Sequence, residues 1–300
     1  MRALITGAGG FVGKHLERHL SSSGDEVTSV DKECDVTSAL DVQRVLRASQ
    51  PEVIYHLAAL THVGDSWNDP VGFTRVNVLG TKNVLDAAHE DCPDALTILV
   101  STSDVYGVVR ESDLPLRESF RTAPANPYSS SKLEAEHFAH EAWRARGQRV
   151  IIARPFNHLG PGQSTKFVVP ALVSRLLEAR ANNATSIPVG DLSTRRDFSD
   201  VRDVVRAYRL LSLYGRAGEV YNIASGVDSS LSDIAQRLRS QIAPEVELVV
   251  DPDLLRPVEI PVMRGNFDKL HEETGWEPSI ALMTSLDDVI NDLRATMANG

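Results

Sequence analysis

Tyr128 and Lys132 stand four residues apart in a stretch whose pattern predicts a helix, so their side chains share one face. A free tyrosine, with a pKa of roughly 10, exchanges protons poorly at neutral pH. A cation beside it favours the phenolate and is expected to lower the pKa of the phenol toward the working range. The pair indicates acid–base chemistry at a carbonyl or hydroxyl group. Many helices contain this spacing by chance, so the rest of the chain must supply a site.

A glycine-rich turn near the start of the chain predicts a dinucleotide site. Gly7, Gly10 and Gly13 follow a short apolar run, and Phe11 and Val12 open the next helical segment. Glycines at such a turn let backbone N–H groups approach a pyrophosphate at the helix N-terminus. A flexible turn without a ligand is the alternative, which the flanking strand and helix disfavour.

Acidic residues after the second predicted strand are candidates for binding the nucleoside. Asp31 lies roughly 20 residues beyond the glycine turn, where a carboxylate binds a ribose diol and repels a 2′-phosphate. We therefore expect NAD(H) to be favoured over NADP(H), although Lys32 beside it could bind that phosphate. Asp35 and Val36 lie where an adenine amino group could be bound. Asp35 could equally cap the helix that starts near Thr37.

Hydroxyl side chains close the fourth predicted strand, in the segment 101–107. The carboxyl ends of the strands form the ligand crevice of a doubly wound sheet. Thr102 is therefore expected to bind a substrate oxygen beside Tyr128, although such clusters are often ordinary turns. Asn77 is expected either to organise backbone or water behind Lys132 or to be an ordinary polar helix residue.

The elements that must position these residues alternate along the N-terminal half. Short apolar runs predict strands at 3–6, 26–30, 53–57, 97–101 and 150–154. Amphipathic segments predict helices at 11–21, 39–48, 71–90 and 128–146. This βαβ alternation predicts an α/β fold with a Rossmann-type, doubly wound parallel sheet.

The C-terminal half is less regular and predicts a smaller lobe. Its expected elements are helices at 169–179, from 201, at 231–242 and at 283–297, a strand at 246–250 and a loop at 182–194. We expect residues 1–155 to form a dinucleotide-binding domain and 156–300 to form mostly a substrate-binding lobe. Residues near 195–225 are expected to return to the first domain.

Composition narrows the class of partners. The chain has 31 basic and 41 acidic residues and a net charge of −10, which argues against nucleic acid and anionic membranes. Hydrophobic content of 42% is ordinary, and no apolar run approaches the ~18 residues of a membrane span. Cys34 and Cys92 lack metal-type spacing, so we expect a reduced, cytoplasmic protein without a metal site.

Taken together, the glycine turn, the segment 56–59, Asn77, the turn at 101–107 and the Tyr128/Lys132 pair resemble the extended short-chain dehydrogenase/reductases that act on nucleotide sugars. The resemblance implies that Thr102 is the catalytic hydroxyl, Tyr128 the acid–base and Lys132 the contact of the nicotinamide ribose. It also implies a homodimer built from the helices at 71–90 and 128–146. The implied cofactor contacts are Gly7, Gly10, Phe11, Val12, Asp31, Asp35, Val36, Leu57, Ala58, Ala59, Asn77, Tyr128, Lys132 and Pro155.

The segment 154–163 and the arginines after it resemble the branch of GDP-mannose 4,6-dehydratases and GDP-4-keto-6-deoxymannose reductases. Arginine suits a diphosphate because its planar group binds two oxygens at once, but Arg195, Arg196 and Arg256 could instead form surface ion pairs. The implied substrate contacts are Ser103, Asp104, Asn157, Phe167, Val168, Arg196, Arg256 and Glu259.

Asp104 separates the activities within this branch. The dehydratases that the chain resembles carry Glu at this place and use it to remove a proton from the sugar, and Asp is one methylene shorter. We therefore expect NADH- or NADPH-dependent reduction of the C4 keto group of a GDP-4-keto-6-deoxy-hexose, with Tyr128 as proton donor. A 4,6-dehydratase or 4-epimerase with tightly bound NAD is the alternative. A dinucleotide-sensing scaffold protein is disfavoured because Thr102, Tyr128 and Lys132 are all present.

Overall fold

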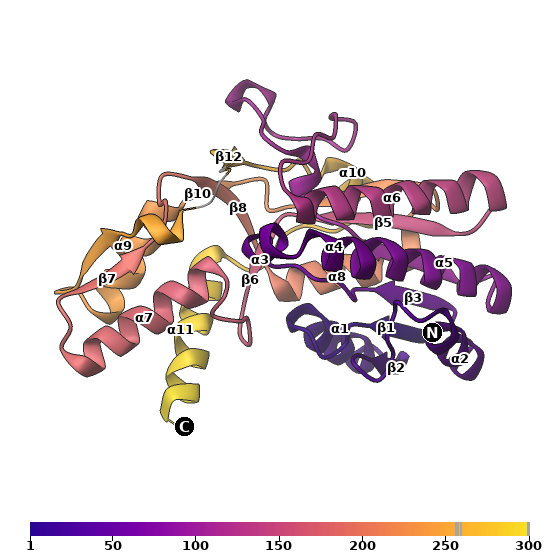
Figure 1. The fold of residues 1–300 in the computed structure, drawn as a ribbon, viewed down its shortest axis with the longest axis horizontal. Helices are drawn as coiled ribbons and strands as arrows, with labels where there is room; N and C mark the ends of the chain where they lie inside the picture. Colours follow the sequence, from indigo (N-terminus) through magenta and orange to yellow (C-terminus); the bar gives the residue numbers. More distant parts are fainter. Residues whose placement is uncertain (256–257, 259, 299–300) are drawn as a thin grey trace.

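The computed structural model describes residues 1–255, 258 and 260–298, and it shows a large body built on a parallel sheet with a smaller lobe beside it (Figure 1). The main sheet has the order β2-β1-β3-β4-β5-β9, and every neighbouring pair is parallel. The predicted α/β fold with a doubly wound, Rossmann-type sheet is confirmed. Its strands are β1 (Arg2–Thr6), β2 (Glu26–Val30), β3 (Val53–His56), β4 (Leu96–Val100), β5 (Val150–Pro155) and β9 (Val220–Ile223).

The strand order changes direction between β1 and β3. After β1 the chain runs to β2 on one side and then returns to β3 on the other side of β1. Such a switch point opens a crevice at the carboxyl ends of the two strands, where ligands of doubly wound sheets bind. The glycine turn follows β1 and the segment 57–60 follows β3, so both meet at this crevice.

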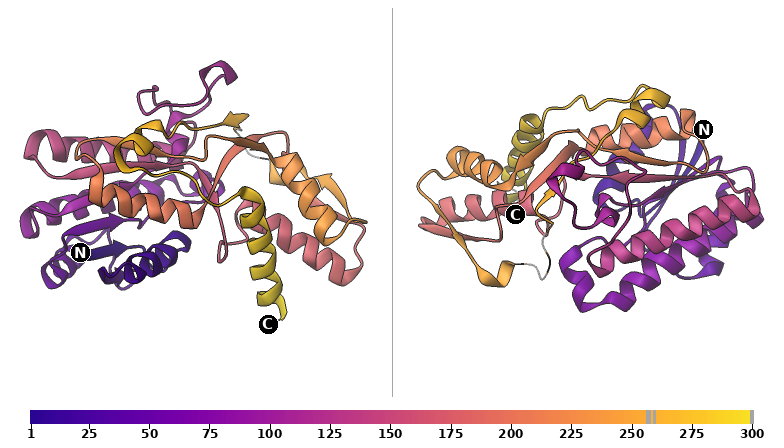
Figure 2. Two further views of the ribbon diagram at one scale, coloured as in Figure 1. Left: turned by 180° about the vertical axis from the view of Figure 1, so that it is seen from behind. Right: turned by 90° about the horizontal axis from the view of Figure 1, so that it is seen from above.

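Alternating side chains bury both faces of the main sheet. Ala3 and Ile5 of β1 pack into one core, and Leu4 of the same strand packs into the core on the other face. Figure 2 shows the helices that cover the sheet, in one view from behind and one from above. The first core is covered by α1 (Phe11–Ser22), α8 (Val201–Tyr214) and α10 (Asp268–Thr274), and the second layer is formed by α2 (Ala39–Ser49), α5 (Gly80–Asp91) and α6 (Pro127–Arg146).

The helix expected at 71–90 is present without a break, but its middle is π-helical. It consists of α4 (Pro70–Phe73), a π-helical turn η1 (Thr74–Leu79) and α5, and it follows a short helix α3 (Val63–Asn68). Asn77 lies in the π-helical turn and is buried. An amphipathic pattern does not distinguish a π turn from regular helix, and such turns occur frequently at functional sites.

The smaller lobe, at the left of Figure 1, is built from three helices whose apolar faces share one core. These are α7 (Val168–Asn182), α9 (Leu231–Ile242) and α11 (Leu282–Ala298). Strand β7 (Ser186–Val189) pairs in parallel with β11 (Glu247–Val250). The prediction of a loop throughout 182–194 is therefore wrong, because Ile187 and Val189 alternate into the core over a stretch too short to show a clear period.

A second, smaller sheet connects the lobe to the main body. Strand β8 (Arg195–Asp200) pairs with β6 (Asn157–Leu159), β10 (Asp228–Ser230) and β12 (Val262–Met263). Helix α8 and strand β9 follow β8 and belong to the main body. The division at residue 155 stays a prediction. The remaining short helices are η2 (Ser103–Tyr106), η3 (Glu111–Asp113) and η4 (Pro252–Leu254).

Within the described part of the chain, no helix is long and apolar enough to cross a membrane. The same residues contain no group of three or more His, Cys, Asp or Glu side chains placed to hold a metal ion. Cys34 and Cys92 are buried free thiols.

Candidate active site

The glycine turn between β1 and α1 is packed too closely for side chains. Gly7 has a φ of 74°, and a Cβ there would lie 2.7 Å from the backbone nitrogen of Ala58. A Cβ on Gly13 would lie 2.4 Å from the carbonyl oxygen of Gly7. Gly10 is the N-cap of α1 and has no side chain to bond the first amides of that helix. These amides can therefore bind an anion such as a pyrophosphate.

Asp31, at the end of β2, lies against the glycine turn. A Cβ on Gly9 would lie 2.4 Å from an Asp31 carboxylate oxygen, so this carboxylate is placed beside the turn, where ribose is expected. Asp35 instead accepts hydrogen bonds from the Thr37 backbone N–H (2.9 Å) and hydroxyl (2.8 Å), which lower the pKa of Asp35. Ser38 is the N-cap of α2. Asp35 therefore takes part in the turn before α2 but is not the cap of that helix, and its contact with adenine stays a prediction.

A neutral histidine supports the crevice between β1 and β3. His56, the last residue of β3, is buried between the hydroxyls of Thr6 (2.7 Å) and Thr81 (3.1 Å). Burial, and then the positive charge of Lys132, lower the pKa of His56 to about 3. The uncharged ring therefore holds the ends of β1 and β3 against α5, and it fixes the start of the half-buried segment 57–59.

Asn77 connects that segment to the helix that carries Tyr128. Its side-chain oxygen accepts from the Leu60 N–H at 2.8 Å, and its side-chain nitrogen donates to the Leu60 carbonyl at 3.0 Å. The same nitrogen donates to the Ser131 hydroxyl at 2.9 Å, which in turn donates to the Tyr128 carbonyl at 2.7 Å. Of the two roles considered for Asn77, the structure shows the organisation of backbone.

Tyr128 lies in the first turn of α6, where the cap fixes the helix start. The side-chain oxygen of Asn126 accepts from the Ser129 N–H at 2.8 Å. The Tyr128 phenol is hydrogen-bonded to the Thr102 hydroxyl, which also accepts from the Asp104 N–H at 3.2 Å. Thr102 comes from the end of β4, so the strand end and the helix start bring the two hydroxyls together.

Burial dominates the electrostatics of this group. It raises the pKa of the Tyr128 phenol, and the negative charge of Asp104 raises it further, whereas the bond to Thr102 lowers it. Burial also lowers the pKa of Lys132 to about 8, against the opposing effect of Glu136. The expectation of a lowered pKa for Tyr128 is therefore wrong for the chain as described, because losing solvent destabilises the phenolate. A neutral phenol is the form that can donate a proton.

The predicted substrate contacts of the lobe gather near the second sheet. Asn157 opens β6 and pairs with Phe198 of β8. Phe167 is the N-cap of α7, and its ring meets His62, which follows β3, edge-on with centroids 6.1 Å apart. This contact joins the lobe to the cofactor side of the crevice. Val168, the first residue of α7, is half-buried beside Phe167.

The arginines of β8 differ from each other. Arg195 forms an ion pair with Asp228 and is half exposed, which is the surface ion pair that the sequence left open. Arg196 is half-buried and donates a hydrogen bond to the Arg195 carbonyl at 3.0 Å. Arg256 and Glu259 lie outside the described residues.

Three predicted contact residues are buried rather than exposed to a crevice. Ser103 is 1% exposed, Pro155 ends β5, and Val36 packs into the core against α5. Any contact of Val36 with adenine would have to use its backbone.

One residue of this region was missed by the sequence prediction. Glu136 lies on α6 one turn beyond Lys132 and is 1% exposed. The repeated four-residue spacing from Tyr128 through Lys132 is the signal that could have found it.

A Rossmann-type sheet with a glycine turn, and a Thr–Tyr–Lys group at the ends of its strands, define an oxidoreductase of the short-chain dehydrogenase/reductase class. The family model described as GDP-mannose 4,6 dehydratase matches residues 32–289, and the chain belongs to this family. The recognition of this family from the sequence is confirmed.

Individual relatives cover nearly the whole chain. GDP-6-deoxy-D-mannose reductase of Pseudomonas aeruginosa is 36% identical over 97% of this chain and 96% of its own length. GDP-6-deoxy-D-talose 4-dehydrogenase of Aggregatibacter actinomycetemcomitans is 36% identical over 90% of each. The solved structure of RMD from Pseudomonas aeruginosa complexed with NADPH is 34% identical, covers 99% of this chain and 100% of its own, and superposes with a TM-score of 0.91.

Proposed function

We propose that the chain reduces the C4 keto group of a GDP-4-keto-6-deoxy-hexose, using NADH or NADPH. The observation that carries the proposal is the buried group of Thr102, Tyr128 and Lys132 at the end of β4 and the start of α6, on the same parallel sheet whose β1 leads into the glycine turn. Reductase and dehydrogenase relatives that match nearly the full chain support the same chemistry.

The residues divide the work of a carbonyl reduction. Bound reduced nicotinamide supplies a hydride to C4. Tyr128 donates its phenolic proton to O4 as the alcohol forms, and its buried, neutral phenol suits that role. Thr102 shares the hydrogen bond to the same oxygen. Lys132 binds the ribose and stabilises the phenolate that remains after proton transfer.

The residues present fit a dinucleotide. A Cβ at Gly7 or Gly9 would clash with Ala58 or Asp31, so glycine is needed for the close packing of this turn, and Gly10 leaves the first amides of α1 without a side-chain cap. Asp31 favours NADH because its carboxylate repels a 2′-phosphate, whereas the exposed Lys32 could bind one. The similar structure from Pseudomonas aeruginosa contains NADPH. Comparing kcat/KM for NADH and NADPH shows whether Asp31 or Lys32 has the larger effect on cofactor preference.

The product at C4 requires its own measurement. The two relatives are named for 6-deoxy-D-mannose and 6-deoxy-D-talose, sugars that differ in configuration at C4, and both are 36% identical to this chain. The configuration depends on which face of the keto sugar meets the nicotinamide. Product analysis after reduction of GDP-4-keto-6-deoxy-mannose distinguishes the two outcomes.

The central test is loss of nicotinamide absorbance with purified GDP-4-keto-6-deoxy-mannose and each reduced cofactor. Tyr128→Phe should abolish turnover while the chain still binds cofactor. Tyr214→Phe is the matched control, because Tyr214 is 60% exposed at the end of α8 and should leave the rate unchanged. Full activity of the Tyr128→Phe variant would show that another group donates the proton.

A 4,6-dehydratase is the second candidate, favoured by the description of the family model. Such an enzyme recycles bound NAD and would convert GDP-mannose without added reduced cofactor. We expect no such conversion, because Asp104 carries a shorter side chain than the Glu of the dehydratases that the chain resembles. Cofactor binding without turnover of any keto sugar would instead support the scaffold protein.

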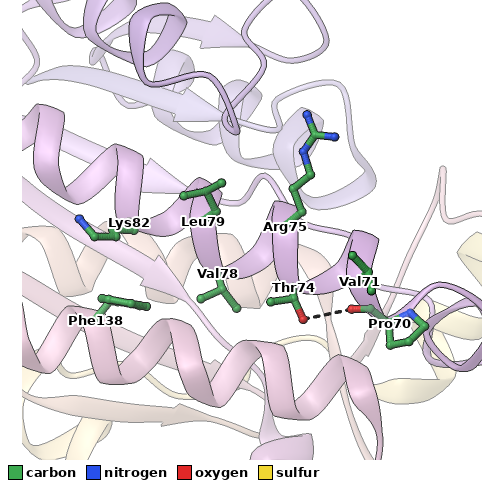
Figure 3. Close-up of a pocket in the computed structure, with 8 residues that line it drawn as sticks. All are labelled: Pro70, Val71, Thr74, Arg75, Val78, Leu79, Lys82 and Phe138. Carbon is green, nitrogen blue, oxygen red and sulfur yellow. Dashed lines mark hydrogen bonds between the residues drawn. The ribbon is translucent and has the colours of Figure 1, made fainter.

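We also propose that two copies of the chain pair through the helical segment 70–91, which comprises α4, η1 and α5, and through α6. A groove of about 490 Å³ lies between these helices and is lined by apolar side chains with two cations (Figure 3). Val71 is 76% and Leu79 43% exposed there, unusually high fractions for large apolar side chains on one face. The lining residues are Pro70, Val71, Thr74, Arg75, Val78, Leu79, Lys82 and Phe138. A second copy would bury this surface by helix-to-helix packing.

Leu79→Glu tests the dimer. Association would remove the new carboxylate in the groove from water, so the dimer should be destabilised. Light scattering after size-exclusion chromatography should show a dimer for the parent chain and a monomer for the variant. Leu213→Glu, on α8 and 40% exposed, is the control and should remain dimeric. A monomeric parent chain would contradict the proposal.

A further inference from the structure

A third ionisable residue shares the face of α6 that carries Tyr128 and Lys132. Glu136 follows Lys132 by one turn, so the three side chains stand at successive four-residue spacings. Tyr128 is 8%, Lys132 4% and Glu136 1% exposed. Carboxylates are almost never buried this deeply unless they are paired.

The Glu136 carboxylate is fixed by groups from two neighbouring strands. Arg154, in β5, donates from Nε to one oxygen at 2.9 Å and from a terminal nitrogen to the other at 2.6 Å. The Ser101 hydroxyl, directly after β4, donates to the first oxygen as well. Because the arginine binds both oxygens, the carboxylate has one orientation rather than several.

Arg154 is itself held in place. Its second terminal nitrogen donates to the Tyr106 hydroxyl at 3.1 Å, and its guanidinium lies over the Tyr106 ring at 5.0 Å from the centroid. The Tyr106 hydroxyl donates to the side-chain oxygen of Asn222, in β9, at 2.7 Å. The carboxylate is therefore attached through Arg154 to β5 and β9 of the main sheet rather than to a loop.

Among the described groups around Lys132, Glu136 is the carboxylate whose charge acts on its ammonium group. From β3 comes His56, which is neutral at physiological pH because its pKa is about 3. From α6 come Tyr128 and Glu136, and Glu136 raises the pKa of Lys132 against the effect of burial. Arg154 is bound to the Glu136 carboxylate, and the charge of Asp104 acts on Tyr128.

We propose that Glu136 is a positioning residue of the reduction, whose carboxylate, fixed by Arg154 and Ser101, holds the buried Lys132 ammonium charged on the Tyr128 face of α6. This inference deepens the proposed function and rests on it for the role of Lys132. A charged Lys132 is needed to stabilise the phenolate after Tyr128 has given up its proton. The alternative is that Glu136 and Arg154 only brace α6 against the sheet.

Direct titration of Lys132 separates the two roles without any turnover. The chain has six lysines, so labelling of lysine Cε gives few NMR signals. The signal that is missing from the spectrum of Lys132→Arg belongs to Lys132. In the parent chain this signal should titrate near the Lys132 pKa of about 8. In Glu136→Gln it should titrate lower by about one unit or more, the usual effect of removing a nearby opposite charge.

Two further variants control for the unpaired arginine that Glu136→Gln leaves behind. The double variant Glu136→Gln/Arg154→Met removes both charges, which buried pairs tolerate better than the loss of one partner. Its Lys132 signal should still titrate below that of the parent chain. Arg154→Met alone keeps the carboxylate, so Lys132 should titrate at or above its parent value. An unchanged Lys132 titration in the double variant would overturn the proposal.

The kinetic counterpart is the pH profile of kcat/KM for keto reduction. Its basic limb should move to lower pH in the double variant and not in Arg154→Met. A brace without an electrostatic role would lower thermal stability in both variants and leave the limb in place, which would also overturn the proposal. If no keto sugar is reduced by the parent chain, the proposed function fails while the NMR titration still reports on Glu136 and Lys132.

Discussion

Replacing the buried lysine should stabilise the chain while it destroys activity. Lys132 is 4% exposed, and burial of its ammonium lowers its pKa from 10.5 to about 8 even with Glu136 nearby. The folded chain therefore holds a charge at neutral pH that it would hold more easily in water. Lys132→Met removes that charge and keeps an unbranched, apolar side chain of similar length.

The drop of about 2.5 units in the pKa of Lys132 corresponds to about 3 kcal/mol, at 1.36 kcal/mol per unit. The unfolded chain keeps its proton up to about 10.5 and the folded chain up to about 8, so between these values the unfolded state binds more protons. The free energy of unfolding of the parent chain should therefore rise with pH across this window. Below about pH 8 both states hold the proton, so the buried charge lowers the free energy of unfolding by its full amount.

Urea unfolding measures the effect directly. At neutral pH, Lys132→Met should raise the free energy of unfolding by about 2–3 kcal/mol, and the gain should shrink well above pH 8 as the parent lysine loses its proton. Lys14→Met is the control: Lys14 is exposed on α1, and its replacement should change stability by less than about 0.5 kcal/mol.

A variant as stable as the parent chain, or less stable, at neutral pH would refute the reasoning. It would show that polar partners of the ammonium compensate fully for its burial. A gain that persists unchanged above pH 8 would also refute it, since the stabilisation would then come from packing rather than from the removed charge.

Three further changes test other parts of the site. Gly7→Ala should lower the free energy of unfolding by at least about 2 kcal/mol and abolish cofactor binding, because φ is 74° and the new Cβ would lie 2.7 Å from Ala58. Thermal unfolding measures the first effect and NADPH fluorescence the second. Values like those of the parent chain would contradict the close packing of the turn. His56 is neutral in the folded chain and protonates near pH 6.5 in the unfolded chain, so the free energy of unfolding should fall as pH drops from about 6.5 toward 3. His56→Leu should make this dependence on pH weaker. An equal dependence in the variant would show that other groups cause it. Asp104→Asn should retain most of the keto-reduction rate, because Tyr128 rather than a carboxylate donates the proton in the proposed reduction. Complete loss of rate would show that a carboxylate base is required.

Much of the main sheet could be predicted because β3, β4 and β5 are buried on both faces and have sequences of short apolar runs. The strands at 26–30 and 150–154 and the helix at 231–242 agree with the structure to within a residue. The errors fall where local pattern carries little information. The π turn around Asn77 keeps the amphipathic period of a helix, and β7 has only two inward side chains, which a loop also tolerates.

The candidate site divides in the same way. The glycine turn and the four-residue spacing of Tyr128 and Lys132 are local, so the sequence could place them. Glu136 was missed because its importance depends on Arg154, 18 residues away on another element. Arg195 had two plausible roles, and only its contact with Asp228 showed that it forms an ion pair.

By itself, the sequence determined the α/β class, the dinucleotide turn and the pairing of a phenol with an ammonium group, because backbone freedom and helix periodicity act over a few residues. Only the tertiary structure decided the charge states. Burial between strands and helices distant in sequence raises the pKa of Tyr128, lowers that of Lys132 and keeps His56 neutral. The cost of removing a charge from water depends on every atom that replaces the solvent, and no local pattern records those atoms.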